Sequence, residues 1–266
     1  MTTVERVLAP NPSMYTGAGT NTYIISSEDE CVIVDPGPVI ESHRAAIVRA
    51  VRHLQPRAVM VTHTHSDHAP LANPLSMSLG IPALGYAAGP EFDPDGTLGD
   101  GDTVAFGRVR AEVVFTPGHT DDHVCFAVGD LLFTGDHIMG GSTVVIDDLA
   151  AYLTSLRRLQ DADWARLYPG HGPEITDAGQ LIQEYIDHRL DRERQIMGAL
   201  GQGAASVGAI VEIVYADVDD SLHPVAAHSV AAHLRKLAGD GVVGFAGRAY
   251  DHGEPGLWDE PVRRLA

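Results

Sequence analysis

Hydrophobic residues in the first half of the chain fall into short runs rich in Val, Ile and Thr, which is the composition of β-strands. Such runs occupy residues 22–25, 31–34, 58–61, 103–106, 109–115, 124–128 and 131–133. Between two of them, at residues 40–54, apolar residues recur at the spacing of an amphipathic helix. The pattern predicts an α/β protein whose strands are connected partly by helices.

Helical periodicity dominates the last third of the chain. Helical patterns occupy residues 176–200, 207–215 and 224–237, and a short apolar run follows at 241–245. Gly198, Gly201 and Gly203 mark a boundary at the end of the first of these helices. We therefore expect two domains, a larger one over residues 1–200 and a small helix–helix–hairpin module over residues 201–266.

Metal-binding side chains are concentrated directly after the predicted strand 58–61. The chain reads Thr62-His63-Thr64-His65-Ser66-Asp67-His68 at this point. Imidazole and carboxylate groups are ligands for zinc, iron and manganese. Ligands two residues apart at a strand end can converge on one ion while the next pair faces another. The spacing therefore indicates two adjacent metal sites.

Three further candidate ligands share one local context, because each directly follows a glycine. They are His119 in Thr-Pro-Gly-His-Thr, Asp136 in Phe-Thr-Gly-Asp, and His171 in Tyr-Pro-Gly-His-Gly. A glycine before a ligand lets the backbone turn sharply and brings the side chain close to an ion where a Cβ would clash. Together with the histidine cluster, this repeated context predicts a metal centre.

With these motifs in order, and with Asp35 in Val-Ile-Val-Asp-Pro-Gly, the chain resembles the metallo-β-lactamase superfamily. Within it, the chain is similar to the β-lactamase-like protein 2 subgroup, on the stretches 19–23, 141–145 and 185–189 and on Arg192, Glu193 and Gln195. The resemblance implies an αββα sandwich followed by a small C-terminal winged-helix-like domain. One departure follows the last histidine of the cluster, where many relatives have a glycine pair and this chain reads Ala69-Pro70-Leu71-Ala72.

The resemblance also implies a set of roles for these residues. It assigns His63, His65 and His119 to one metal, Asp67, His68 and His171 to the second, and the Asp136 carboxylate to both. The cofactors expected are two divalent metal ions, with zinc as the first choice. Asp35 is expected to orient a histidine or a loop from behind the ligands. Asn21, Tyr23, Ser142 and Thr143 are candidates for the pocket wall or, equally, for a role in a turn or strand.

A pair of divalent ions suggests hydrolysis, in which a metal-bridging hydroxide attacks the substrate and Asp67 and Asp136 act as catalytic residues. The subgroup resemblance implies single-stranded RNA as substrate. The alternative is a thioesterase or glyoxalase-II-like hydrolase of small acyl thiols. Two further alternatives are a mononuclear iron dioxygenase of the persulfide type, built on His63, His119 and Asp136, and a non-enzymatic, metal-stabilised interaction module.

Charge and composition restrict the partners. The chain carries 18 Lys and Arg against 36 Asp and Glu, a net charge of −18, which opposes attraction to phosphate backbones and acidic membranes. Residues 201–266 contain 5 basic and 9 acidic side chains. We therefore expect no duplex DNA at the C-terminal module and favour a packing, gating or homodimer role. Only two cysteines and no membrane-length apolar run predict a cytoplasmic protein.

Overall fold

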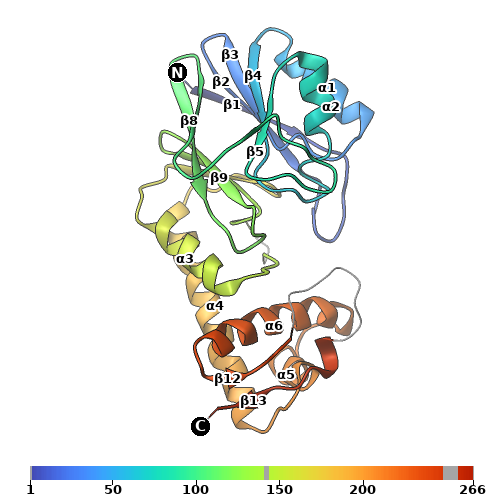
Figure 1. The fold of residues 1–266 in the computed structure, drawn as a ribbon, viewed down its shortest axis with the longest axis vertical. Helices are drawn as coiled ribbons and strands as arrows, with labels where there is room; N and C mark the ends of the chain where they lie inside the picture. The colour runs from blue at the N-terminus through green and yellow to red at the C-terminus, as the bar shows by residue number, and fades with distance from the viewer. Residues whose placement is uncertain (1, 141–143, 248–256, 266) are drawn as a thin grey trace. The chain divides into compact units, whose positions relative to one another are not determined.

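The computed structural model describes residues 2–140, 144–247 and 257–265. The chain forms two compact units. The first consists of Met1–Pro117, Asp122–Val144 and Ala162–Gly179, and the second of Gly118–Asp121, Val145–Asp161 and Gln180–Ala266. The first unit contains two β-sheets, and the second is mainly helical (Figure 1).

The first sheet has the strand order β1-β2-β3-β4-β5-β6. Its strands are β1 (Thr2–Leu8), β2 (Asn21–Ser27), β3 (Glu30–Val34), β4 (Gln55–Met60), β5 (Ala83–Gly85) and β6 (Gly96–Thr97). β1, β2 and β3 pair antiparallel, whereas β3 to β6 run parallel. Parallel neighbours need a crossover connection, which α1 (Glu41–Val51) supplies between β3 and β4 and α2 (Ala72–Leu79) supplies between β4 and β5.

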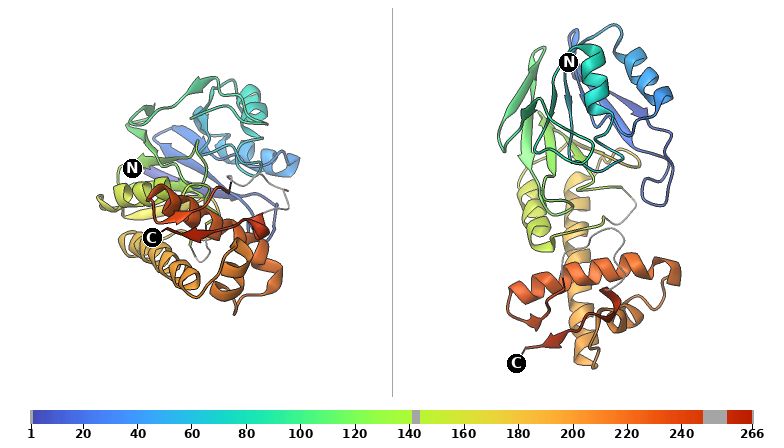
Figure 2. Two further views of the ribbon diagram at one scale, coloured as in Figure 1. Left: turned by 60° about the horizontal axis from the view of Figure 1, so that its bottom comes forward. Right: turned by 45° about the vertical axis from the view of Figure 1, so that its right-hand side comes forward.

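The second sheet has the order β11-β10-β9-β8-β7. It is built from β7 (Thr103–Phe106), β8 (Val109–Phe115), β9 (Val124–Val128), β10 (Leu131–Gly135) and β11 (Arg166–Pro169). Neighbours from β7 to β10 pair antiparallel, and β11 joins β10 in parallel after the chain has passed through α3 (Leu149–Gln160). The two sheets form separate layers in both views of Figure 2.

Alternation along the central strands explains how the first sheet is buried on both faces. Val32 and Val34 of β3 belong to a core shared with Phe126 and Phe133 of the second sheet. Ile33, between them, belongs to a second core with residues of α1 and α2. Successive strand residues point to opposite faces, so a strand covered on both sides must be apolar throughout. This is why residues 31–34 form a continuous hydrophobic run.

The second unit contains the helix–helix–hairpin module that the periodicity predicts. Its elements are α4 (Ala178–Gly201), α5 (Val207–Val214), α6 (His223–Gly239), β12 (Val243–Gly244) and β13 (Arg263–Arg264), with 3-10 turns at Asp220–Leu222 and Leu257–Asp259. Ile196 and Leu200 at the end of α4 pack with Ile210 of α5 and Leu234 of α6. The domain boundary after residue 200 stays a prediction. Among the described residues, no helix combines the length and the apolar character needed to cross a membrane.

Every predicted strand and helix is present, but six elements within residues 1–200 were missed. They are β1, α2, α3 and β11, together with the short β5 and β6. β1 is an edge strand with exposed or half-buried residues throughout, so its sequence carries no long apolar run. The predicted strand 58–61 begins earlier, at Gln55, because Pro56 is accommodated next to a register shift against β3.

Phe133 gives a test of the core between the sheets. It is 1% exposed, stacks on Tyr168 at 4.8 Å between ring centroids, and meets Tyr23 edge-on at 5.4 Å. We expect Phe133→Ala to lower the free energy of unfolding by about 3–5 kcal/mol, because the cavity cannot close fully. Urea denaturation measures this. Met77→Ala is the control, because Met77 is 82% exposed and its replacement should lower the free energy of unfolding by less than about 0.5 kcal/mol. Equal losses in the two variants would contradict the packing of Phe133.

Candidate metal centre

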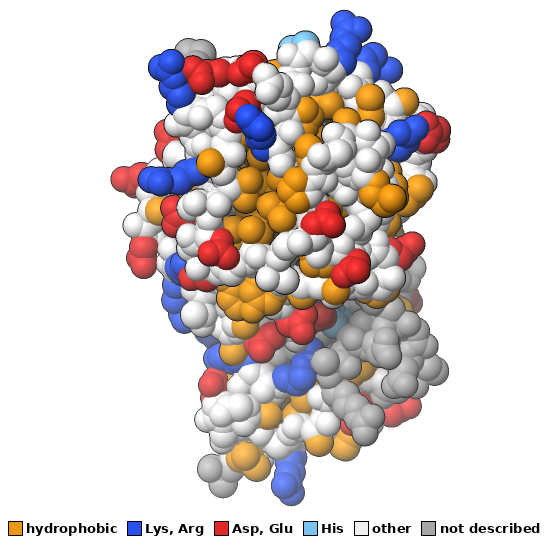
Figure 3. Space-filling model, turned by 45° about the horizontal axis from the view of Figure 1, so that its top comes forward, with side chains coloured by type: hydrophobic (Ala, Val, Ile, Leu, Met, Phe, Trp, Pro, Cys, Tyr) orange, Lys and Arg blue, Asp and Glu red, His pale blue; other side chains and the backbone are white. Residues whose placement is uncertain are grey.

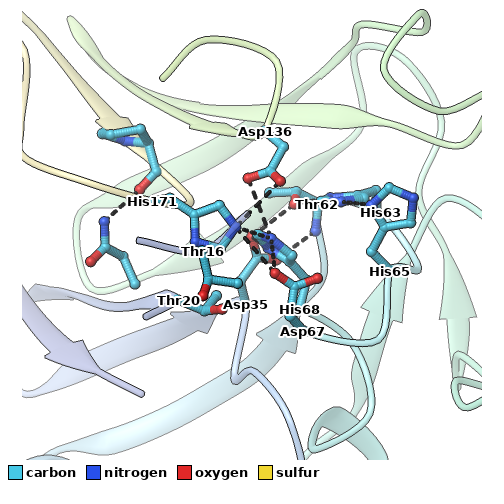
Figure 4. Close-up of polar contacts among 12 residues, drawn as sticks. Thr16, Thr20, Asp35, Thr62, His63, His65, Asp67, His68, Asp136 and His171 are labelled. Atoms are coloured by element: carbon cyan, nitrogen blue, oxygen red, sulfur yellow. Dashed lines mark hydrogen bonds and ion pairs between the residues drawn. The ribbon is translucent and has the colours of Figure 1, made fainter. Parts of the chain in front are cut away.

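The structure brings the seven predicted ligands together in two groups. His63, His65, His119 and Asp136 form one, and Asp67, His68 and His171 form the other; within each group the ligand atoms lie within 4.8 Å of one another. The residues come from segments that follow β4, β8, β10 and β11. Figure 4 shows Asp67, His68, Asp136 and His171 pointing toward a common centre, with His63 and His65 beside them.

Distances in the second group are those of ligand atoms that face each other directly. The Nε2 atoms of His68 and His171 are 3.3 Å apart. Asp67 Oδ2 lies 3.1 Å from His171 Nε2 and 3.6 Å from His68 Nε2. One ion between these donor atoms would therefore be in reach of all three side chains.

Asp136 reaches both groups. Its Oδ1 lies 3.3 Å from His68 Nε2 and its Oδ2 lies 3.3 Å from His171 Nε2, although it also belongs to the group of His63 and His65. In that group, His63 Nε2 and His65 Nδ1 are 3.0 Å apart. One carboxylate in contact with two adjacent ligand groups is the arrangement that a bridging ligand requires.

Hydrogen bonds to backbone carbonyls fix which ring nitrogen of His119 and of His171 faces the centre. Nδ1 of His171 lies 3.2 Å from the Gly19 carbonyl, and Nδ1 of His119 lies 2.6 Å from the Val145 carbonyl. A carbonyl oxygen only accepts, so these Nδ1 atoms carry a proton and the Nε2 atoms are the ones that can bind a metal ion. The Nε2 atoms of His68 and His171 face each other, and their lone pairs repel unless a proton or a metal ion lies between them. The donor set therefore fits divalent metal ions.

Asp35 connects the two groups from behind. Its side chain is 2% exposed and accepts hydrogen bonds from the Thr62 amide (2.8 Å), the Thr62 hydroxyl (2.7 Å) and His68 Nδ1 (2.9 Å). The Thr62 oxygen in turn lies 3.0 Å from His63 Nδ1 and accepts its proton. Asp35 thus sets the ring orientation of His68 directly and that of His63 through Thr62, which is the positioning role expected for it.

The charges at the centre act on one another through little solvent. Burial opposes ionisation of Asp67, but the charge of His68 and a hydrogen bond from His171 lower its pKa to about 2. Burial also opposes charge on His171, yet hydrogen bonds to Asp136 and Asp67 raise its pKa to about 9. The pKa of His68 is raised and that of Asp136 lowered for the same reasons. The carboxylates therefore favour positive charge between them.

Gly170, before His171, shows why these ligands follow glycines. A Cβ on this residue would lie 2.5 Å from Asp136 Oδ1 and 2.6 Å from His68 Cε1. Both atoms belong to predicted ligands, so no side chain fits here without displacing the site. The close approach that the sequence pattern predicts is therefore a steric requirement at this position.

Several supporting residues were not predicted. Thr62 relays Asp35 to His63, and the Asp122 carboxylate accepts the Thr64 amide (2.9 Å) and thereby holds the histidine loop. The carbonyls of Gly19 and Val145 fix two of the rings, and a backbone carbonyl leaves no trace in a sequence. Thr62 could have been found from its place between a strand and the first ligand.

The candidates for the pocket wall have other surroundings. The Asn21 amide donates to the carbonyls of Pro169 and Gly172, at 2.9 Å each, and so holds the two sides of the His171 turn. Tyr23 is 2% exposed in the core between the sheets, and its hydroxyl donates to the Pro169 carbonyl. Of the two roles considered for Tyr23, the contacts therefore favour the strand role over a place in the pocket wall. Ser142 and Thr143 lie outside the described residues.

Comparison with known families identifies the class of protein. Residues 15–75 and 69–171 match the metallo-β-lactamase superfamily, and residues 206–252 match the β-lactamase associated winged helix domain. The chain therefore belongs to the metallo-β-lactamase superfamily. Its relatives include a β-lactamase-like protein 2 homolog of Caenorhabditis elegans, which is 32% identical over 90% of this chain and 85% of that protein.

Two further matches bear on function and fold. An atrochrysone carboxyl ACP thioesterase of Aspergillus chevalieri is 35% identical over 91% of this chain and 83% of that protein. The crystal structure of a metallo-β-lactamase family protein from Thermus thermophilus covers 98% of both chains with a TM-score of 0.78, at 19% identity, and so has the same fold.

These findings confirm the predicted fold, the αββα metallo-β-lactamase sandwich with a C-terminal winged helix. They also confirm that the protein is an enzyme, a hydrolase of this superfamily with a cluster of His and Asp residues for divalent metal ions. The alternative of a non-enzymatic interaction module is therefore wrong.

Asp35→Asn tests the support behind the ligands. The side-chain amide of the substituted residue has one acceptor oxygen fewer than Asp35 and no negative charge. The rings of His68 and His63 therefore lose their fixed orientation. We expect metal affinity to fall about 10–100-fold. Competition with a coloured chelator measures it, and Asp93→Asn, which alters an exposed carboxylate, is the control. Unchanged affinity in Asp35→Asn would contradict the positioning role.

The pKa values of the metal-free protein predict how its stability depends on pH. The pKa of His171 is raised from 6.5 to about 9, so its contribution is complete below pH 6.5 and is lost as the pH rises through 9. The pKa of Asp67 is lowered from 3.8 to about 2, so its contribution is lost only below pH 3.8. We expect urea unfolding of metal-free protein to give lower stability at about pH 9.5 than at about pH 6. His171→Gln should reduce that difference. A free energy of unfolding that increases between these two pH values would contradict the raised pKa of His171.

Proposed function

We propose that this protein is a dinuclear metal hydrolase, and that zinc is its native metal. His63, His65 and His119 would hold one ion, Asp67, His68 and His171 would hold the second, and Asp136 would contact both. The observation that carries this proposal is the contact of one carboxylate, Asp136, with two complete and adjacent ligand groups. Zinc suits a set of imidazoles and carboxylates that serves hydrolysis without a redox step.

When bound, two such ions lower the pKa of water toward neutrality and polarise the oxygen of the electrophile. Among the acidic ligands, Asp67 is the more accessible, since its side chain is 26% exposed and that of Asp136 is 10% exposed. Asp67 is therefore placed to accept a hydrogen bond from the attacking nucleophile and to orient it. Asp136 holds the two ligand groups in fixed relation.

A small acyl thioester is the substrate class that we favour, which reverses the order suggested by the subgroup resemblance. A relative that is 35% identical is named an ACP thioesterase. Met14 and Tyr15 are more than 60% exposed in the loop whose Gly19 carbonyl holds His171, and such apolar side chains suit an acyl chain. On the face in Figure 3, basic and acidic side chains are interspersed around a hydrophobic area. A polyanion gains little from such a surface.

Single-stranded RNA is the second candidate. It is supported by the subgroup resemblance and by a groove between β1 and the end of α1, which Arg6, Arg49 and Arg52 line. Cationic side chains of this kind are what a phosphate backbone needs. The groove also contains Glu5, and the protein as a whole carries a net charge of −18.

The test is to measure metal content and two activities on one sample. Protein purified without chelator or added metal is analysed for elements and assayed with an acyl thioester and with labelled single-stranded RNA. About two zinc ions per chain with thioester cleavage supports the proposal. Cleavage of RNA alone would favour the second candidate substrate. One iron ion per chain would indicate oxygen chemistry instead of hydrolysis. Activity without bound metal would overturn the proposed function.

Asp67→Ala separates catalysis from folding. We expect turnover to fall by about 10²-fold or more, because the variant loses both a metal ligand and the group that orients the nucleophile. Thermal unfolding of the metal-free variant should change far less than turnover does. Elemental analysis distinguishes loss of metal from loss of chemistry, and Asp93→Ala is the control. Parallel loss of stability and turnover would mean that Asp67 is chiefly structural.

A further inference from the structure

Arg235, on helix α6 of the winged-helix region, contacts the start of helix α3 within the second unit. Its Nη2 donates a hydrogen bond to the main-chain carbonyl of Asp147, at 3.0 Å. Burial of the guanidinium lowers its pKa, while the charges of Asp147 and Asp148 act in the opposite direction. A half-buried guanidinium that donates to a backbone carbonyl fixes the position of that segment.

A second residue of α6 reaches the same place. His228 is 4% exposed, and its Nε2 lies 3.4 Å from Asp147 Oδ1. Helix α6 therefore contacts both the main chain and the side chain of Asp147. The Asp148 carboxylate accepts the Ala151 amide at 3.0 Å and caps the first turn of α3, so the segment is also fixed from the helix side.

The segment that α6 holds is bonded to the loop of His119. The amides of Asp147 and Asp148 both donate to the Gly118 carbonyl, at 2.9 and 3.0 Å. Two residues earlier, the Val145 carbonyl accepts the Nδ1 proton of His119 at 2.6 Å. The ring orientation of His119, and the nitrogen that it offers as a ligand, thus depend on where residues 145–148 lie.

Gly118 lets the His119 loop lie directly against the backbone of α3. Its φ is +135°, and a Cβ there would lie 2.4 Å from the Tyr152 Cα. The loop therefore packs against the backbone of α3, with no side chain between them. A shift of the α3 start would be passed to His119 directly, because both hydrogen bonds and backbone contact link them.

We propose that Arg235 is a positioning residue for His119. By holding Asp147, it keeps the Val145 carbonyl where it accepts the Nδ1 proton, so that Nε2 remains the ligand atom. This rests on the proposed role of His119 in the metal centre. It gives the winged-helix region a function within the enzyme, namely to complete the geometry of one ligand.

Lys236, the neighbour of Arg235 on α6, provides a matched control. It forms ion pairs with Glu193 and Asp240, at 2.9 Å each. Its removal therefore deletes two ion pairs of α6, neither of which involves residues 145–148. Arg235→Ala and Lys236→Ala each delete one cation from the same turn of the helix. Only the first removes the donor to Asp147, and Arg235→Lys keeps a donor at that position.

The experiment uses the full-length protein, stripped of metal and titrated with Co²⁺ in competition with a chelator. In Arg235→Ala we expect one of two Co²⁺ equivalents to bind about 10–100-fold more weakly, with a changed visible spectrum. Arg235→Lys should restore most of that affinity, and Lys236→Ala should bind both equivalents as the wild type does. Thermal unfolding of the metal-free variants records any general loss of stability.

The proposal is overturned if Arg235→Ala binds both equivalents with wild-type affinity and spectrum, or if Lys236→Ala weakens the same equivalent equally. Should Arg235→Ala fail to fold, Arg235→Gln is held to the same criterion, because it keeps more of the side chain. Co²⁺ binding needs no substrate. A wild type that binds two ions and hydrolyses nothing would thus end the proposed function and leave this inference standing.

Discussion

The Asp35 carboxylate, buried at the end of β3, is the constraint on which the metal centre depends. It accepts the Thr62 amide and hydroxyl from the strand next to it and Nδ1 of His68 from the loop beyond. A buried carboxylate with three donors is stabilised only if all three stay in place. Because Thr62 passes the same constraint to His63, one side chain orients a ligand in each group. Asp35 itself adopts a φ of +49°, a strained conformation that these bonds offset.

Two of the seven predicted ligands, Asp67 and Asp136, place negative charge at the centre of a protein that is already acidic. Asp67 and Asp136 face His68 and His171 with little solvent between them, and these contacts raise the pKa of the imidazoles and lower that of the carboxylates. A divalent ion satisfies the carboxylates without protonating the rings. The site is thus arranged for cations, and Arg235 of α6 donates a hydrogen bond to the segment whose Val145 carbonyl accepts the His119 proton.

Prediction from the sequence succeeded where one local signal was sufficient. Residues 31–34 form a continuous apolar run because both faces of β3 are covered, and this run predicted the strand. β1 was missed because it is an edge strand, and α2 because the Ala69-Pro70-Leu71-Ala72 departure, which leads into the helix, looks like a loop. In the structure Ala69, Leu71 and Ala72 are almost fully buried against the first sheet. That loop is therefore reshaped into a packed helix start, with every predicted ligand still present.

The sequence by itself determined the residue types and spacings of the ligands, the glycines that precede three of them, and the central strands that carry them. These are local properties, since a strand or a turn is specified by neighbours along the chain. Only the tertiary structure decided which atoms meet. Asp136 contacts His68 and His171, Thr62 relays Asp35 to His63, and the Val145 carbonyl fixes His119. Each of these contacts joins side chains or backbone groups whose distance depends on how the sheets and helices pack, which spacing along the chain does not encode.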